Sequence, residues 1–147
     1  MLLLFALSGP LLASIDWRER RLPDVMTLPL ALACLLALTS DALVTGQWSR
    51  WGVALACALG ATLFFLILFI ASPSQMGFGD VKLMLSAGLV LGWHGPMVTL
   101  LGVGLGLMIG LGFGLVQIIR RRADPRSHLA LGPHLIAGVL IVGLLAY

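Results

Sequence analysis

The sequence predicts an all-α, polytopic membrane protein with about six transmembrane helices, in a single domain that covers residues 1–147. Of the 147 residues, 60% are hydrophobic and 10% are charged, whereas a soluble domain is about half apolar and a quarter charged. The apolar residues also gather in long runs, and several approach the roughly 20 residues that a membrane-spanning helix needs. The net charge of +3 is too small to indicate nucleic acid, so the lipid bilayer is the expected partner.

Six apolar segments follow one another, at about residues 1–17, 25–44, 51–71, 81–94, 96–119 and 129–147. The first segment has no basic region before its apolar run, so it resembles a first spanning helix more than a cleaved signal peptide. The first and fourth segments are short and need flanking residues to cross a bilayer. The longest polar loop, ASPSQMGFGD, separates the third and fourth segments.

The basic residues predict the orientation of these segments. If the N-terminus is outside, eight of the nine basic residues fall in inside loops: Arg18, Arg20, Arg21, Lys82, Arg120, Arg121, Arg122 and Arg126. Only Arg50 then lies outside, as expected if basic residues concentrate in cytoplasmic loops. We therefore expect both termini outside, with the WRERRLPD and GFGD loops facing the cytoplasm.

Glycines recur every four residues in the fifth segment, at Gly102, Gly106, Gly110 and Gly114. This spacing places them on one face of a helix, where a neighbouring helix can approach closely. Packing is the simpler interpretation, and a hinge that admits a substrate segment is the alternative.

The sequence predicts no metal, cofactor or disulfide. Cys34 and Cys57 lie inside apolar runs and form no Cys-x-x-Cys motif, so we expect two small buried apolar residues. His128 and His134 are near no cysteine and are a weak metal signal.

Four of the six acidic residues have ordinary explanations. Asp41 and Asp124 lie in loops and are expected to be solvated, and Glu19 lies among arginines with which it pairs weakly. Asp24 follows Pro23 and precedes an apolar helix, which favours a helix N-cap role.

Asp16 lies at the end of the first apolar segment. The fifteen residues before it cover only about 22 Å of a membrane core of about 30 Å, so the helix must continue past Asp16. A carboxylate placed below the membrane surface is costly and suggests a functional role. A salt bridge to Arg20, four residues later, is the alternative.

Asp80 also lies at a membrane edge, directly after Gly77 and Gly79 in the stretch MGFGDVKLM. These glycines can adopt positive φ and allow another backbone or a ligand to approach. The alternative is that Asp80 caps the fourth helix. Lys82 either pairs with Asp80 or marks the inside face.

Asp16 and Asp80 are expected on the same side of the membrane at similar depth. Two carboxylates a few ångströms apart share one proton, so one can activate water while the other polarises a peptide carbonyl. This is the chemistry of an aspartic protease. An ion-coupled transporter or channel subunit is the alternative, although its site would be expected nearer the membrane midplane. A scaffold without catalytic activity is a further alternative.

Three stretches, IDWRERRLPD, MGFGDVKLM and LGPHLIAG, resemble the type IV prepilin peptidases, which are membrane aspartyl proteases of the GxGD type. The resemblance implies that Asp16 and Asp80 are catalytic. It also implies that the matched residues Gly77, Gly79, Lys82, Gly132 and Pro133 bind substrate or support the loops. Asp24 matches a position where other members have Asn, which favours capping over catalysis.

The resemblance further implies a bacterial inner-membrane endopeptidase of type IV pilus or protein secretion systems. Its substrate would be the basic leader of a prepilin or pseudopilin, cut at the cytoplasmic face. Basic loops beside both acids favour this cut over one inside the membrane. The paired Cys-x-x-Cys motifs of longer members are absent, so we expect a short, peptidase-only form without methyltransferase activity. His134 stands where an aromatic residue is common.

Overall fold

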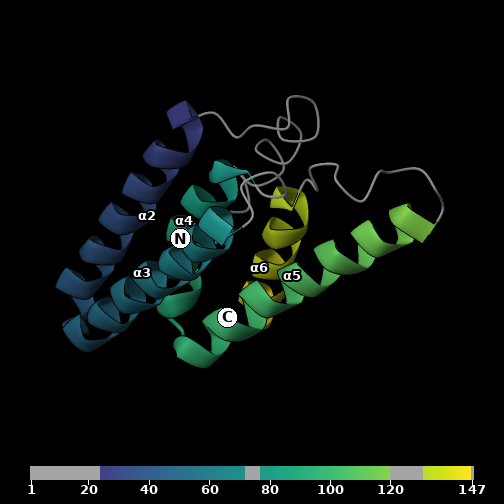
Figure 1. Ribbon diagram of the computed structural model, residues 1–147. Helices are drawn as coiled ribbons and strands as arrows, with labels where there is room; N and C mark the ends of the chain where they lie inside the picture. The colour runs from purple at the N-terminus through teal and green to yellow at the C-terminus, as the bar shows by residue number, and fades with distance from the viewer. Residues whose placement is uncertain (1–23, 72–76, 120–130, 147) are drawn as a thin grey trace.

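The computed structural model describes residues 24–71, 77–119 and 131–146. These residues form five helices, α2 (Asp24–Thr45), α3 (Trp48–Ala71), α4 (Phe78–Gly92), α5 (Pro96–Ile119) and α6 (Gly132–Ala146), as Figure 1 shows. The all-α prediction is confirmed over this part of the chain. Each of the last five apolar segments forms one helix, and the first, residues 1–17, lies outside the described residues.

Three of the described helices are long and apolar enough to cross a membrane, over Thr27–Thr45, Trp48–Ala71 and Pro96–Gln117. α4 and α6 have 15 residues each, which corresponds to about 22 Å of helix. The structure therefore supports a membrane protein with three candidate spans. Six spans and the orientation with an outside N-terminus remain predictions from the sequence.

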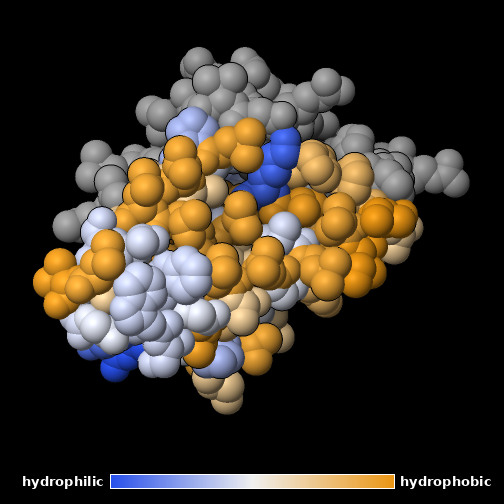
Figure 2. Space-filling view, turned by 90° about the vertical axis from the view of Figure 1, so that its left-hand side faces the viewer, coloured by the Kyte–Doolittle hydropathy of each residue, from blue (hydrophilic) through white to orange (hydrophobic). Residues whose placement is uncertain are grey.

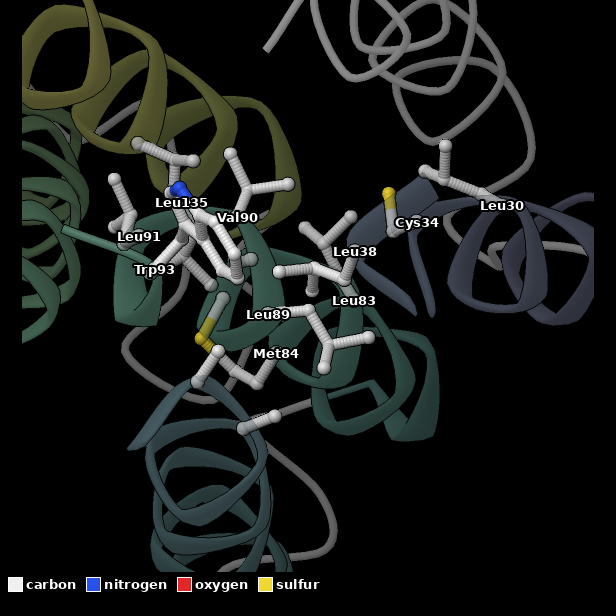
Figure 3. Close-up of a cluster of buried hydrophobic side chains, with 14 of the residues drawn as sticks. Leu30, Cys34, Leu38, Leu83, Met84, Leu89, Val90, Leu91, Trp93 and Leu135 are labelled. Carbon is white, nitrogen blue, oxygen red and sulfur yellow. The ribbon is translucent and has the colours of Figure 1, made fainter. Parts of the chain in front are cut away.

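α4 occupies the centre of the helix bundle and contacts each of the other four described helices. Figure 3 shows its side chains pointing toward neighbours on several sides, with Leu83 beside Leu38 of α2. Eleven of its residues are buried, and they include Leu83, Met84, Ala87 and Leu91. A helix that is apolar all round is expected to lie inside a bundle, so its sequence suits this position.

The outer faces of the long helices carry large exposed apolar side chains. Leu63 and Ile67 of α3 are more than half exposed, as are Leu100 and Met108 of α5. Figure 2 shows a broad apolar surface on the side formed by α2 and α3, with paler and hydrophilic side chains at its lower end. Apolar patches of this extent are unusual for a soluble monomer and are expected for a surface that contacts lipid.

The glycine stripe of α5 packs against neighbouring helices. A Cβ built on Gly106 would lie 2.8 Å from Leu135 Cα, and one on Gly110 would lie 2.7 Å from Leu131 Cδ2. A Cβ on Gly102 would overlap Leu91 of α4. The predicted packing role is therefore confirmed for these three glycines.

The bundle has two ends that differ in character. We call the end that holds the α2–α3 link (residues 46–47) and the α4–α5 link (residues 93–95) the hairpin end. Gly46 and Gly95 allow these tight links because their φ angles, 70° and 121°, are in the left-handed region that favours glycine. α2, α4 and α6 begin at the opposite end (Figure 1), which we call the Asp80 end.

Candidate active site

Asp80 is buried in the first turn of α4, with 4% of its surface exposed. The helix begins at Phe78 and its N-cap is Gly77, which is extended at φ −79° and ψ 140° and has no side-chain capping bond. The Asp80 N–H donates to the Gly77 carbonyl at 3.1 Å. The alternative that Asp80 itself caps the fourth helix is therefore wrong, because Asp80 is the third helical residue. A carboxylate at this position is stabilised by the partial positive charge of the helix N-terminus.

The two glycines of the GFGD stretch do not use the left-handed conformation that the sequence allows. Gly77 has negative φ, Gly79 lies within α4, and the positive-φ glycines among the described residues are Gly46 and Gly95. Instead, Gly77 leaves space beside the acid, since a Cβ built on it would lie 3.9 Å from Asp80 Oδ2. The backbone of Gly77 thus lies next to the carboxylate without a side chain between them.

Aromatic contacts attach the start of α4 to the end of α3. The Phe78 ring centroid lies 5.4 Å from that of Phe69, near the end of α3. Lys82 Nζ lies 4.7 Å from the Phe78 centroid, within the range of a cation–π interaction. Lys82 therefore helps to position the turn that carries Asp80.

The third matched stretch also begins at the Asp80 end. Gly132 is buried as the first residue of α6, and Pro133 is partly buried as the second. The first turn tolerates a proline because a backbone N–H there has no partner within the helix. The Leu131 carbonyl accepts hydrogen bonds from His134 N–H at 3.1 Å and Leu135 N–H at 3.0 Å. Gly132 and Pro133 thus belong to the same end of the bundle as Gly77, Gly79 and Lys82.

His134 packs as an aromatic residue between α5 and α6. Its ring centroid lies 4.9 Å from that of Phe113, with an interplanar angle of 39°. A Cβ on Gly110 would lie 3.5 Å from His134 Cβ. His134 therefore packs through its ring, as an aromatic side chain would at this position.

Two acids singled out from the sequence cannot be placed in this site. Asp16 lies outside the described residues, so its pairing with Asp80, like its alternative pairing with Arg20, remains a prediction. Asp24 is the first residue of α2, but its side chain is outside the described part, so the capping role also remains a prediction. Within the described residues, no group of three His, Cys, Asp or Glu side chains is placed to hold a metal ion.

Thr27 is a buried polar residue that the sequence patterns above do not single out. It is 1% exposed, on the face of α2 that also buries Leu30, Cys34 and Leu38. Its hydroxyl has no hydrogen-bond partner among the described residues. The signal in the sequence was a threonine in the apolar i, i+3, i+7, i+11 pattern of this helix.

The other four threonines bond to their own helices or to the preceding turn. Each donates its hydroxyl to the carbonyl four residues earlier: Thr39 to Leu35, Thr45 to Asp41, Thr62 to Ala58 and Thr99 to Gly95. Thr27 thus differs from every other threonine in the chain.

Comparison with known proteins places this arrangement in a family. A profile of the type IV leader peptidase family matches residues 2–116. The prepilin leader peptidase/N-methyltransferase of Escherichia coli K12 is 30% identical over 138 residues, which cover 92% of this chain and 59% of that protein. The enzyme of the same name from Dickeya chrysanthemi is 34% identical over 125 residues, covering 84% of this chain and 43% of that protein.

A third relative of the same name, from Burkholderia pseudomallei 1026b, is 32% identical over 145 residues, covering 91% of this chain and 43% of that protein. The chain thus spans about half the length of the curated relatives it matches. No solved structure shows a significant match to the chain. The family profile covers most of the sequence, including the GFGD stretch that begins α4, and the chain belongs to the type IV leader peptidase family.

Proposed function

We propose that this protein is a membrane aspartic endopeptidase that removes the basic leader peptide of type IV prepilins or pseudopilins. The observation that carries the proposal is the burial of Asp80 in the first turn of α4, beside the bare backbone of Gly77. Buried carboxylates are rare unless they are paired or functional. The family match supports assigning this acid to peptide hydrolysis.

Asp16 and Asp80 act together in the proposed mechanism. The ionised carboxylate takes a proton from a water molecule, whose oxygen attacks the carbonyl carbon of the scissile peptide. The other carboxylic acid donates its proton to the carbonyl oxygen. The tetrahedral intermediate then collapses and the C–N bond breaks. One hydroxyl of the intermediate returns a proton to the ionised aspartate, and the amine leaves with the proton of the other aspartate. No covalent bond between enzyme and substrate forms.

The remaining site residues hold the substrate and the reacting groups in place. The bare backbone of Gly77 leaves room for the substrate backbone next to Asp80, and the family match supports assigning Gly79 to the same loop. Lys82 supports the turn through Phe78. Gly132 and Pro133 start α6 at the same end of the bundle. Productive cleavage requires such positioning, because reacting atoms must be held about 3–3.5 Å apart.

The proposed location is the bacterial inner membrane, with the site at the cytoplasmic face. The concentration of basic residues in loops beside Asp16 and Asp80 supports this orientation. The matched relatives are named as prepilin leader peptidases and N-methyltransferases. We propose only the peptidase activity here, because the buried Asp80 and the GFGD stretch suit peptide hydrolysis.

Mass spectrometry of a co-expressed prepilin tests this function. The wild-type protein is expected to yield the shortened pilin, whereas Asp16→Asn and Asp80→Asn yield the intact prepilin at equal protein levels. Normal processing by either variant would contradict the two-aspartate mechanism. A gradient-dependent ion flux without any product peptide would instead indicate the transporter alternative.

A further inference from the structure

A second site candidate lies at the hairpin end, far along the bundle from Asp80. A cavity of about 330 Å³ opens between the start of α3 and the α4–α5 link. Ser49, Arg50 and Val53 line it from α3, and residues 92–96 line it from the other side. The mechanism proposed above uses none of these residues.

The chemistry of the cavity suits an anion. Arg50 is exposed and, among the described residues, makes no ion pair with a carboxylate. Among the residues that the structure describes, no acidic residue lines the cavity, whereas Ser49 and His94 do. An arginine offers several N–H donors in a planar fork that matches phosphate oxygens.

Two helices begin at this cavity and add to its positive potential. Ser49 is the second residue of α3, and Pro96 is the first residue of α5. The N-terminus of a helix carries a partial positive charge that favours a nearby anion. The N–H groups of Arg50 and Trp51 donate to the Gln47 carbonyl and Pro96 has no N–H, so the helix ends contribute through this charge. These helix dipoles add to the positive potential that Arg50 creates at the cavity.

The tryptophans of the hairpin end, above all the half-exposed Trp48, support a membrane boundary there. Trp48 and Trp51 lie in the first turn of α3, with ring centroids 6.2 Å apart, and Trp93 itself lines the cavity. Trp51 Nε1 donates to Thr39 Oγ1 at 3.2 Å. Tryptophan is enriched at the level of lipid headgroups. Figure 2 shows paler and hydrophilic side chains at this end, below the apolar surface.

We propose that this cavity is a phosphate-binding site, formed by Arg50, Ser49 and the start of α5, that takes the headgroup phosphate of a membrane phospholipid. The site would fix a lipid against the links that join α2 to α3 and α4 to α5. It is independent of the proposed peptidase function, since its residues lie at the opposite end of the bundle from Asp80. A free phosphate ion presents the same chemical group as the lipid headgroup and is the alternative ligand.

His94 provides a local reporter of binding. Its pKa is lowered from the ordinary value of 6.5, first by burial and then by the charge of Arg50. A phosphate bound to Arg50 would offset that charge, so the pKa of His94 is expected to rise when the site is filled.

Native mass spectrometry of the full chain in neutral detergent tests the proposal. The protein is titrated with dioleoylphosphatidylglycerol, with dioleoylglycerol, which has no phosphate, and with inorganic phosphate. We expect phosphatidylglycerol to bind most tightly, and Arg50→Gln to weaken it about tenfold, as the loss of a charged hydrogen-bond donor predicts. Ser49→Ala, a smaller change, is expected to weaken it about threefold.

Asp41→Asn is the matched control. Asp41 lies partly buried in the last turns of α2 at the same end, so the expectation of a solvated loop residue was wrong. It does not line the cavity, so its neutral variant is expected to bind the lipid as the wild type does. Equal retention of phosphatidylglycerol by Arg50→Gln, Ser49→Ala and the control would overturn the site, as would equal binding of dioleoylglycerol. Arg50-dependent binding of inorganic phosphate as tight as that of the lipid would overturn the assignment to a headgroup.

Discussion

Gly106 of α5 and Gly138 of α6 bring their helix backbones into direct contact, since a Cβ built on Gly138 would lie 2.6 Å from Gly106 Cα. Helices in a membrane associate largely through such close packing, because lipid removes most of the hydrophobic driving force between them. This contact fixes α6, the shorter helix that begins with Gly132 and Pro133 at the Asp80 end.

Gly138→Ala is expected to destabilise the protein by about 1–3 kcal/mol, because the added methyl group overpacks a backbone contact. Gly104→Ala is the control on α5, since nothing lies within 4 Å of its Cβ position. That variant should be neutral, or more stable by up to about 1 kcal/mol, through its higher helix propensity. Thermal unfolding in detergent measures both, and equal effects would contradict the packing role of Gly138.

Asp80→Asn is expected to abolish cleavage of a prepilin, with a loss of at least about 10²-fold, because it removes a proton-transfer group. Asp24→Asn should reduce the cleavage rate much less, since Asn is as good an N-cap as Asp. Cleavage rates in membranes, normalised to protein level, distinguish the two variants. Complete loss in Asp24→Asn would overturn its capping role.

Gly77→Ala tests the space beside the carboxylate. The added Cβ would lie 3.9 Å from Asp80 Oδ2, an ordinary contact, so the melting temperature should change little. The cleavage rate is expected to fall at least about tenfold, since a small displacement of the substrate from the reacting groups lowers the rate of reaction steeply. Gly112→Ala, at an open position of α5, is the matched control. Unchanged cleavage by Gly77→Ala would show that substrate does not approach there.

Thr27→Val is expected to leave stability unchanged or slightly higher, because a buried hydroxyl without a partner costs free energy. Thr39→Val should instead cost about 1–2 kcal/mol, since Thr39 donates to the Leu35 carbonyl and accepts from Trp51 Nε1. Denaturation of both variants in detergent gives the comparison. A larger loss for Thr27→Val would mean that its hydroxyl is bonded in the folded protein.

The lowered pKa of His94 predicts a pH dependence of stability. The folded protein binds a proton at His94 less readily than the unfolded chain does. The contribution of neutral His94 to the free energy of unfolding is therefore fully present above about pH 6.5, and it is lost as the pH falls through the pKa of the folded protein. The melting temperature of the wild type should therefore decline below about pH 6.5 more steeply than that of His94→Gln. Parallel curves for the two proteins would contradict this effect.

The sequence by itself determined the helical segments, because long apolar runs must satisfy their backbone hydrogen bonds within a helix when they cross a membrane. It also predicted the packing of Gly102, Gly106 and Gly110, since a four-residue spacing is a property of the helix alone. The importance of Asp80 could likewise be inferred locally, from a single acid at the edge of an apolar run.

Only the tertiary structure decided what surrounds these segments. It placed α4 at the centre of the bundle, and it made Asp80 a buried residue of the first turn rather than a cap. The stacking of His134 on Phe113 and the cavity beside Arg50 also arise only there. The physical reason is common to all of these features: each depends on side chains from helices that are distant in sequence, and periodicity within one helix carries no information about which neighbour covers it.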